Sequence, residues 1–162
     1  MSFANYVPHK YLELPKEVTN RIHQKINAMM NEFFQKLQTI SQYFTYDSHQ
    51  EMIFYDGRSV ISWTGAWVII GTCPYYSEEG KLLGFLPYLD LIEVLMKDKT
   101  IQSTEVTIID QDSGLNDNWE NELRLLLEKS IPCFTFAVKH ERELMNERKV
   151  KAIKEAAEKY EL

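Results

Sequence analysis

The 162-residue sequence has few cysteines, prolines and glycines, and it has no long run of apolar residues. Its 2 Cys, 5 Pro and 6 Gly exclude a disulfide framework and leave no room for a long disordered linker. No stretch approaches the roughly 18 apolar residues that a membrane span requires, and residues 1–11 lack the features of a signal peptide. We therefore expect a single soluble, cytoplasmic domain over residues 1–162, with no membrane partner.

The motifs that carry common chemistries are also missing from the sequence. It contains no glycine-rich phosphate loop, no histidine pair at metal-binding spacing and no serine in a nucleophile elbow. Cys73 and Cys133 lie in segments of β-forming residues without a Cys or His neighbour at metal spacing, so we interpret both as buried, reduced thiols. The sequence thus predicts no cofactor, and it favours an interaction domain over an enzyme.

The formal net charge of −6 is concentrated in the middle of the chain. Residues 78–128 contain twelve acidic and four basic residues, whereas residues 1–77 contain six of each and residues 129–162 contain six acidic and eight basic residues. An acidic surface repels phosphate backbones and attracts a basic protein or a divalent cation. We therefore expect no nucleic-acid partner; the acidic surface either binds a protein or serves solubility.

The first half of the chain has a helical pattern followed by a strand pattern. After Pro15, apolar residues recur every three or four positions as far as Phe44, which predicts a helix of about seven turns. Its apolar stripe either packs on the sheet or lines a homodimer. Beyond it, Asp56-Gly57 predicts a tight hairpin between residues 51–55 and 58–63. A second hairpin is expected to pair residues 66–76 with residues 81–85.

The second half alternates between helix and strand patterns. We predict helices from Pro87 to about Lys97, at 119–129 and at 141–160, and strands at 105–110 and 131–138, with Pro132 ending the second helix. This order is that of a βαβα-like segment with a right-handed crossover. The predicted fold class is α+β, with a mixed, mainly antiparallel sheet on which a long N-terminal helix and this segment pack.

The last predicted helix has a narrow apolar seam among many charged residues. The seam consists of Val150, Ile153, Ala157 and Tyr160. We expect it to pack against its own domain, and docking on another protein is the alternative.

The polar loop after residue 110 is the strongest candidate for chemistry. Asp110 and Asp112 follow a predicted strand and are candidate ligands for magnesium or calcium, although Gly114 and Leu115 depart from the pattern of a calcium loop. Asp117 and Glu120 have the spacing of an acidic capping box, which explains both residues without any ligand.

The next seven residues, Asp-Asn-Trp-Glu-Asn-Glu-Leu at 117–123, lie between two predicted strands. They resemble the Trp-and-Glu helix of TIR domains and of nucleoside deoxyribosyltransferase-like folds, although Glu122 lies three rather than four positions after Trp119. The resemblance implies that Glu122 is an acid that contacts a ribose. It supports an alternative function, a small nucleotide- or metal-binding enzyme that uses the loop and helix start from Asp110 to Glu122.

Exposed aromatic side chains surrounded by acidic ones are typical of a binding hot spot. The favoured function is a non-enzymatic protein-interaction domain, similar in kind to immunity proteins, antitoxins or inhibitors, whose partner is a protein with a basic surface. The predicted binding residues are Asp110, Asp112, Asp117, Trp119, Glu120, Tyr75 and Tyr76.

Overall fold

The computed structural model describes residues 14–86 and 105–160. Helix α2 (Lys16–Ile40) and helix α4 (Trp119–Lys159) flank a set of short strands in the chain order. The strands are β1 (Phe44–Asp47), β2 (Met52–Tyr55), β3 (Arg58–Trp63), β4 (Trp67–Ile70), β5 (Cys73–Tyr76), β6 (Leu82–Leu86), β7 (Glu105–Thr107), β8 (Ile109–Asp110) and β9 (Gly114–Leu115). The helix predicted from Pro87 lies outside the described residues.

The strands form one larger sheet and two ribbons. The five-stranded sheet has the order β1-β2-β3-β4-β7, and β5-β6 and β8-β9 form two-stranded ribbons. Every pairing within the described part of the chain is antiparallel. The predicted fold class is confirmed as α+β, with an antiparallel sheet, a long N-terminal helix and a C-terminal helix.

Helix α2 follows Pro15, as the apolar pattern predicts, but it ends before Phe44. Ser41 adopts an extended conformation, and its N–H donates to the Leu37 carbonyl. Phe44 therefore starts β1, where it pairs with Tyr55 across the sheet. The apolar stripe of the helix is buried within its own chain, through Ile22, Ile26, Met30, Phe33 and Leu37.

The hairpin predicted at Asp56-Gly57 is confirmed, and the second one is shorter than predicted. Asp56 and Gly57 have φ values of 48° and 80°, which a two-residue turn between β2 and β3 requires. Residues 66–76 form two strands instead of one, since β4 pairs with β3 and β7 while β5 pairs with β6. The break is at Gly71, where an added Cβ would lie 2.9 Å from the Phe85 carbonyl oxygen.

The largest correction concerns residues 131–138, which are helical. They belong to α4, a single helix of 41 residues with Pro132 inside it. Because this segment is a helix and β7 runs antiparallel to β4, the predicted βαβ crossover is wrong. The physical reason is burial at a helical spacing, through Trp119, Leu123, Leu126, Leu127, Ser130, Cys133, Phe134, Ala137 and Val138.

Side-chain hydroxyls support the helix around this proline. Pro132 has no N–H to donate to the carbonyl four residues earlier. On either side of it, the Ser130 hydroxyl donates to the Leu126 carbonyl at 2.7 Å, and the Thr135 hydroxyl donates to the Ile131 carbonyl at 2.8 Å. The Ser130 hydrogen bond is buried, whereas the Thr135 hydrogen bond lies on the exposed side of the helix.

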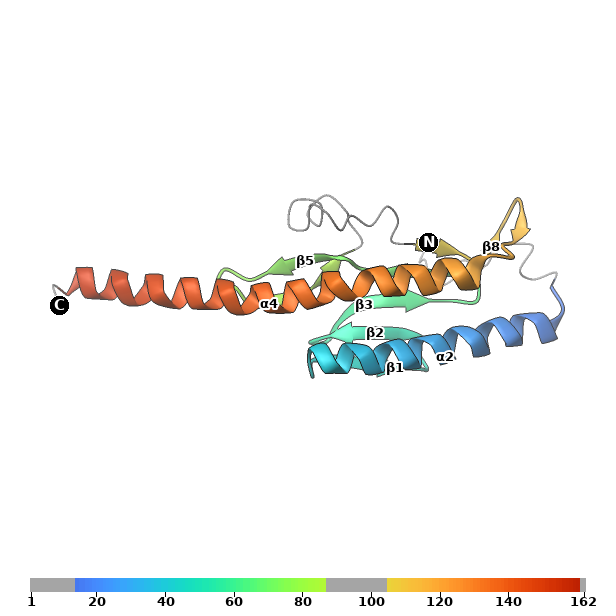
Figure 1. The fold of residues 1–162 in the computed structure, drawn as a ribbon, viewed down its shortest axis with the longest axis horizontal. Helices are drawn as coiled ribbons and strands as arrows, with labels where there is room; N and C mark the ends of the chain where they lie inside the picture. The colour runs from blue at the N-terminus through green and yellow to red at the C-terminus, as the bar shows by residue number, and fades with distance from the viewer. Residues whose placement is uncertain (1–13, 87–104, 161–162) are drawn as a thin grey trace.

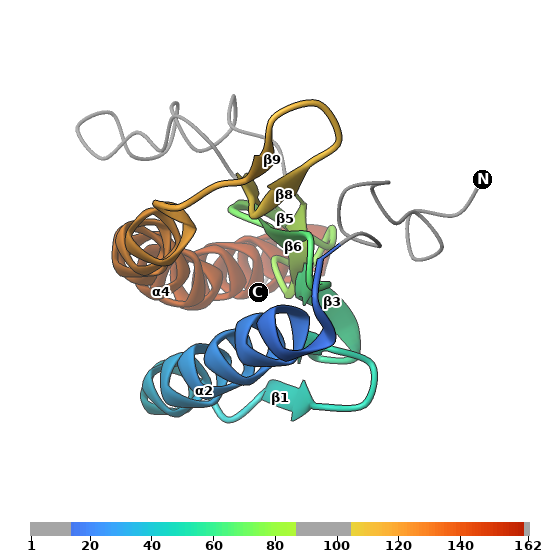
Figure 2. The same ribbon diagram turned by 90° about the vertical axis from the view of Figure 1, so that its right-hand side faces the viewer.

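Helices α2 and α4 lie side by side on one side of the strands and run in the same direction (Figures 1 and 2). Near their starts, Lys25 lies 3.6 Å from Glu120, and farther along, the rings of Phe33 and Phe134 are 6.3 Å apart. Phe134 also contacts the rings of Phe44 and Phe85 from the strands. Phe134, near the middle of α4, therefore joins this helix to α2 and to the strands through an aromatic cluster in the core.

The C-terminal part of α4 extends past the sheet, and beyond the β5–β6 turn no other described element runs beside it (Figure 1). Val150, Ile153 and Tyr160 are 65%, 62% and 66% exposed. The expectation that this seam packs on its own domain is therefore wrong.

Within residues 14–86 and 105–160, no helix is both long enough and apolar enough to cross a membrane.

Candidate functional site

The loop between β8 and β9 contains the predicted cation ligands. One carboxylate oxygen of Asp110 accepts a hydrogen bond from the Ser113 hydroxyl at 2.6 Å, and the other accepts one from the Asp112 N–H at 3.5 Å. Hydrogen bonds from the Ser113 hydroxyl and from backbone N–H groups of the loop, that of Asp112 first among them, lower the pKa of Asp110. Asp110 therefore stabilises the turn in which it lies, and its carboxylate remains exposed.

Glu122 is held by the same loop. Its carboxylate accepts a hydrogen bond from the Asn116 side-chain amide at 2.6 Å, and that amide also donates to the Thr107 carbonyl at 3.1 Å. Asn116 thus joins the end of β7 to the first turn of α4. The strand predicted to follow this helix is absent, so the feature on which the resemblance to TIR domains depends is not present.

The start of α4 differs from the predicted capping box. The N-cap residue is Asn118, and its side chain makes no capping hydrogen bond. The Asn118 N–H instead donates to the Asn116 side-chain oxygen at 3.1 Å. Asp117 is therefore not the cap, and it is exposed. Its carboxylate remains available to a partner.

The acidic residues of this region gather at one end of the molecule, which we call the acidic end and define as residues 105–123. This stretch contains six acidic residues and no Lys or Arg. It comprises β7, β8, β9 and the first turn of α4, which adjoin one another at the end opposite the projecting part of α4 (Figure 1). Five of the six acidic residues are exposed: Glu105, Asp110, Asp112, Asp117 and Glu122.

None of the three predicted aromatic binding residues forms an exposed part of the acidic end. Trp119 is only 7% exposed and packs into the core. Tyr76 donates its hydroxyl to the Ala137 carbonyl at 3.2 Å, near the middle of α4, and its ring contacts His140 edge-on. Tyr75 accepts a hydrogen bond from Arg58 at 3.2 Å. The three aspartates are therefore exposed between β8 and the start of α4, whereas both tyrosines lie on β5.

Glu141 is a partly buried carboxylate that sequence reasoning did not single out. Its side chain accepts the Leu82 N–H at 2.6 Å and the Tyr55 hydroxyl at 3.5 Å. Burial, followed by the charge of Glu141, raises the pKa of Tyr55 to about 12, and the same two causes raise that of Tyr76. No neighbour in the sequence signals this role, because Tyr55 and Leu82 lie on β2 and β6. Glu141 ties α4 to the strands.

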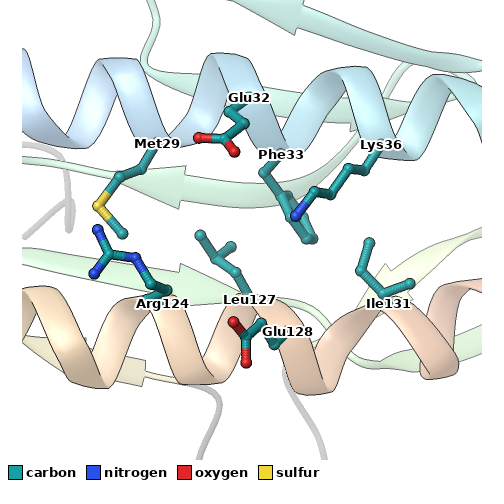
Figure 3. Close-up of a pocket in the computed structure, with 8 residues that line it drawn as sticks. All are labelled: Met29, Glu32, Phe33, Lys36, Arg124, Leu127, Glu128 and Ile131. Atoms are coloured by element: carbon teal, nitrogen blue, oxygen red, sulfur yellow. The ribbon is translucent and has the colours of Figure 1, made fainter.

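A groove separates α2 from α4 on the surface (Figure 3). Its volume is about 180 Å³, below the roughly 300–1,000 Å³ of typical small-ligand pockets. Figure 3 shows Met29 from α2 and Arg124 from α4 pointing toward each other across it. Apolar side chains line its floor and charged ones its rim: Met29, Phe33, Leu127 and Ile131, and Glu32, Lys36, Arg124 and Glu128. The groove is better suited to joining two helices than to enclosing a substrate.

The part of the chain that the structure describes contains no preformed metal site. No three or more His, Cys, Asp or Glu side chains there are placed to hold one ion. Comparison of the chain with protein-family models, curated proteins and solved structures finds no match. The geometry described above is therefore the basis for any functional proposal.

Proposed function

We propose that the chain is a non-enzymatic interaction domain that binds a partner protein with a basic surface through its acidic end. The observation that carries the proposal is the placement of six acidic residues and no base in residues 105–123 at one end of the molecule. Charge of one sign on one surface accelerates encounter with an oppositely charged protein and selects against acidic partners. Immunity proteins, antitoxins and inhibitors are the functional class that this mode of binding fits.

The proposed contact residues are Asp110, Asp112 and Asp117, together with Glu120, whose carboxylate lies 3.6 Å from Lys25 of α2. The three aspartates are exposed, and they extend from a short ribbon that is anchored to β7 and α4 by Asn116. A rigid support of this kind reduces the entropy that the loop loses on binding. Trp119 and Tyr76 serve packing in this proposal rather than contact.

The test compares capture of proteins from the native host by the wild type and by the variant Asp110→Lys, Asp112→Lys, Asp117→Lys. A matched control reverses three carboxylates elsewhere, at Glu78, Glu155 and Glu158, so that the net charge changes equally. We expect a stoichiometric partner that the control retains and the loop variant loses, with binding that weakens steeply as salt is added. A partner retained equally by both variants, or insensitive to salt, would contradict the proposal.

The alternative function, a small nucleotide- or metal-binding enzyme, predicts a different result at the same loop. Magnesium, calcium or a nucleotide should then raise the thermal midpoint of unfolding, and Asp112→Asn or Glu122→Gln should abolish that increase. The interaction domain predicts no such shift. One ligand screen therefore separates the two functions.

A further inference from the structure

The projecting part of α4, residues 143–160, contacts the other described elements through one face. Arg148 donates hydrogen bonds to the carbonyls of Ser77, at 2.6 Å, and of Glu78 in the β5–β6 turn. The same turn approaches Leu144 so closely that a Cβ added at Gly80 would lie 2.9 Å from its carbonyl carbon. Between residues 149 and 160 every side chain except that of Ala157 is exposed.

The opposite face of this segment has the pattern of a coiled-coil seam. Asn146, Val150, Ile153, Ala157 and Tyr160 follow one another at spacings of four, three, four and three, which are the a and d positions of a heptad repeat. At about 100° per residue, this seam lies roughly 180° around the helix from Leu144 and Arg148. The β5–β6 turn therefore leaves it accessible to another helix.

We infer that residues 143–160 of α4 pair with the same segment of a second copy of this chain, as an antiparallel two-helix interface. Charge complementarity selects this occupant and this direction. When Val150 is placed opposite Ile153 of the second copy, Glu147 lies beside Lys154 of the second copy, and the symmetric pair forms as well. Lys149 then faces the small Ala156 of the second copy. Every flanking contact is thus attractive or neutral.

In a parallel pair the attraction between Arg142 and Glu147 of the second copy is offset by a repulsion nearer the middle of the segment. The residue before one a position lies beside the residue after the next d position of the partner helix, which places Lys149 against Lys154 of the second copy on both sides. Like charges in these positions repel. The antiparallel pair is also closed by a two-fold axis, so it produces a dimer rather than a filament.

The overlapping segment of 18 residues spans about 27 Å, which is short for a coiled coil. We therefore expect a weak, concentration-dependent dimer. Asn146 occupies a core position opposite Ala157 of the second copy, where a polar side chain fixes the register at some cost in affinity. The acidic end lies at the far end of each subunit and remains free, so the dimer would present two such ends.

Sedimentation velocity of the full chain over about a hundredfold range of concentration tests the inference. We expect a monomer–dimer equilibrium in the wild type and about a hundredfold weaker association in Ile153→Glu, since each dimer buries this side chain twice. Because Ile153 is 62% exposed in the subunit, circular dichroism and thermal unfolding of the variant should match the wild type. A wild type that is monomeric throughout, or a dimer insensitive to Ile153→Glu, overturns the inference.

Charge-swapped variants test the direction of pairing. Glu147→Lys and Lys154→Glu should each weaken the dimer by about tenfold, and the double variant should restore it, because both cross-helix pairs are then re-formed with reversed sign. Lys151→Glu, which lies away from the seam, is the matched control and should leave association unchanged. Failure of the double variant to recover would exclude this antiparallel register and overturn the inference.

Discussion

The two halves of α4 share one helical geometry but differ in everything around it. Residues 119–138 pack into the core, with nine buried side chains at helical spacing, whereas none of residues 139–160 is buried. The first half also contains Pro132 and several residues that favour strands, while the second is rich in Ala, Lys, Glu and Arg. Tertiary packing therefore holds the first half helical against its local propensity. The second half has a composition that favours helix and only a few tertiary contacts, such as those of Glu141 and Arg148.

The largest effect is expected from the aromatic cluster in the first half. Phe134 is fully buried against Phe33, Phe44 and Phe85, so Phe134→Ala should lower the free energy of unfolding by about 3–5 kcal/mol. Ile153→Ala in the second half is the control and should change it by less than about 0.5 kcal/mol at concentrations where the chain is monomeric. Denaturant titration measures both values. Similar losses in the two variants would remove the distinction between the halves.

Pro132 is the clearest mark of that distinction, because its helix forms in spite of it. Pro132→Ala restores the missing N–H and removes the clash of the proline ring, so it should raise the free energy of unfolding by about 2–3 kcal/mol. Chemical denaturation of the variant beside the wild type checks the sign. A loss of stability would show that the proline ring fills space in the core that alanine leaves empty.

Glu141 marks the boundary between the halves. Removing its carboxylate leaves the Leu82 N–H without its partner, so Glu141→Ala should cost about 1–3 kcal/mol of unfolding free energy. Glu143→Ala, two residues later and exposed, is the matched control and should have little effect. If both substitutions prove equally mild, the cooperative core ends before residue 141.

The Tyr55 hydroxyl donates to Glu141 at the same boundary. The raised pKa of Tyr55 predicts that the free energy of unfolding depends on pH in the alkaline range. Its pKa is raised to about 12, mainly by burial, so the unfolded chain releases the proton above pH ~10 while the folded chain retains it. The free energy of unfolding is therefore unaffected below pH ~10 and falls as the pH rises toward 12. Between pH ~9 and pH ~11 the wild type should lose about 1 kcal/mol more than Tyr55→Phe does. Identical pH profiles would contradict the shift.

The smallest global effect is expected at the far end of α4. Ala156→Gly weakens the local helix by about 1 kcal/mol and should lower the helical signal in circular dichroism. The midpoint of global unfolding should hardly move, because no core contact depends on this turn. A shift as large as that of Glu141→Ala would mean that the projecting segment unfolds together with the core.

The parts of the fold that the sequence predicted depend on short-range signals. The stripe from Ile22 to Leu37 and the Asp56-Gly57 turn are each encoded within a few neighbouring residues. Their structure follows from helical spacing and from the backbone angles that the turn requires. The antiparallel pairings of β2 with β3 and of β5 with β6 were predictable for the same reason, whereas β1 was missed.

Residues 131–138 were mispredicted because two local signals pointed away from helix. Pro132 and a run of β-forming residues outweighed a helical spacing that continues across them, through Leu127, Ser130, Phe134 and Ala137. The helical period can be read from the sequence, whereas the burial of these side chains in the folded protein cannot. The same limit applies to Tyr76, whose partner Ala137 is 61 positions away. The acidic end, in contrast, was partly visible as a stretch of unbalanced charge.

The position of Phe134 in the chain also bears on how the protein folds during synthesis. The rings that it covers, those of Phe33, Phe44 and Phe85, belong to the first 86 residues, so the ribosome makes them long before their cover. Until α4 follows, the nascent sheet and α2 present an open aromatic surface of the kind that chaperones bind. Translation that pauses between residues 86 and 134 would prolong that exposure, so aggregation in the cell should depend on elongation rate as well as on stability.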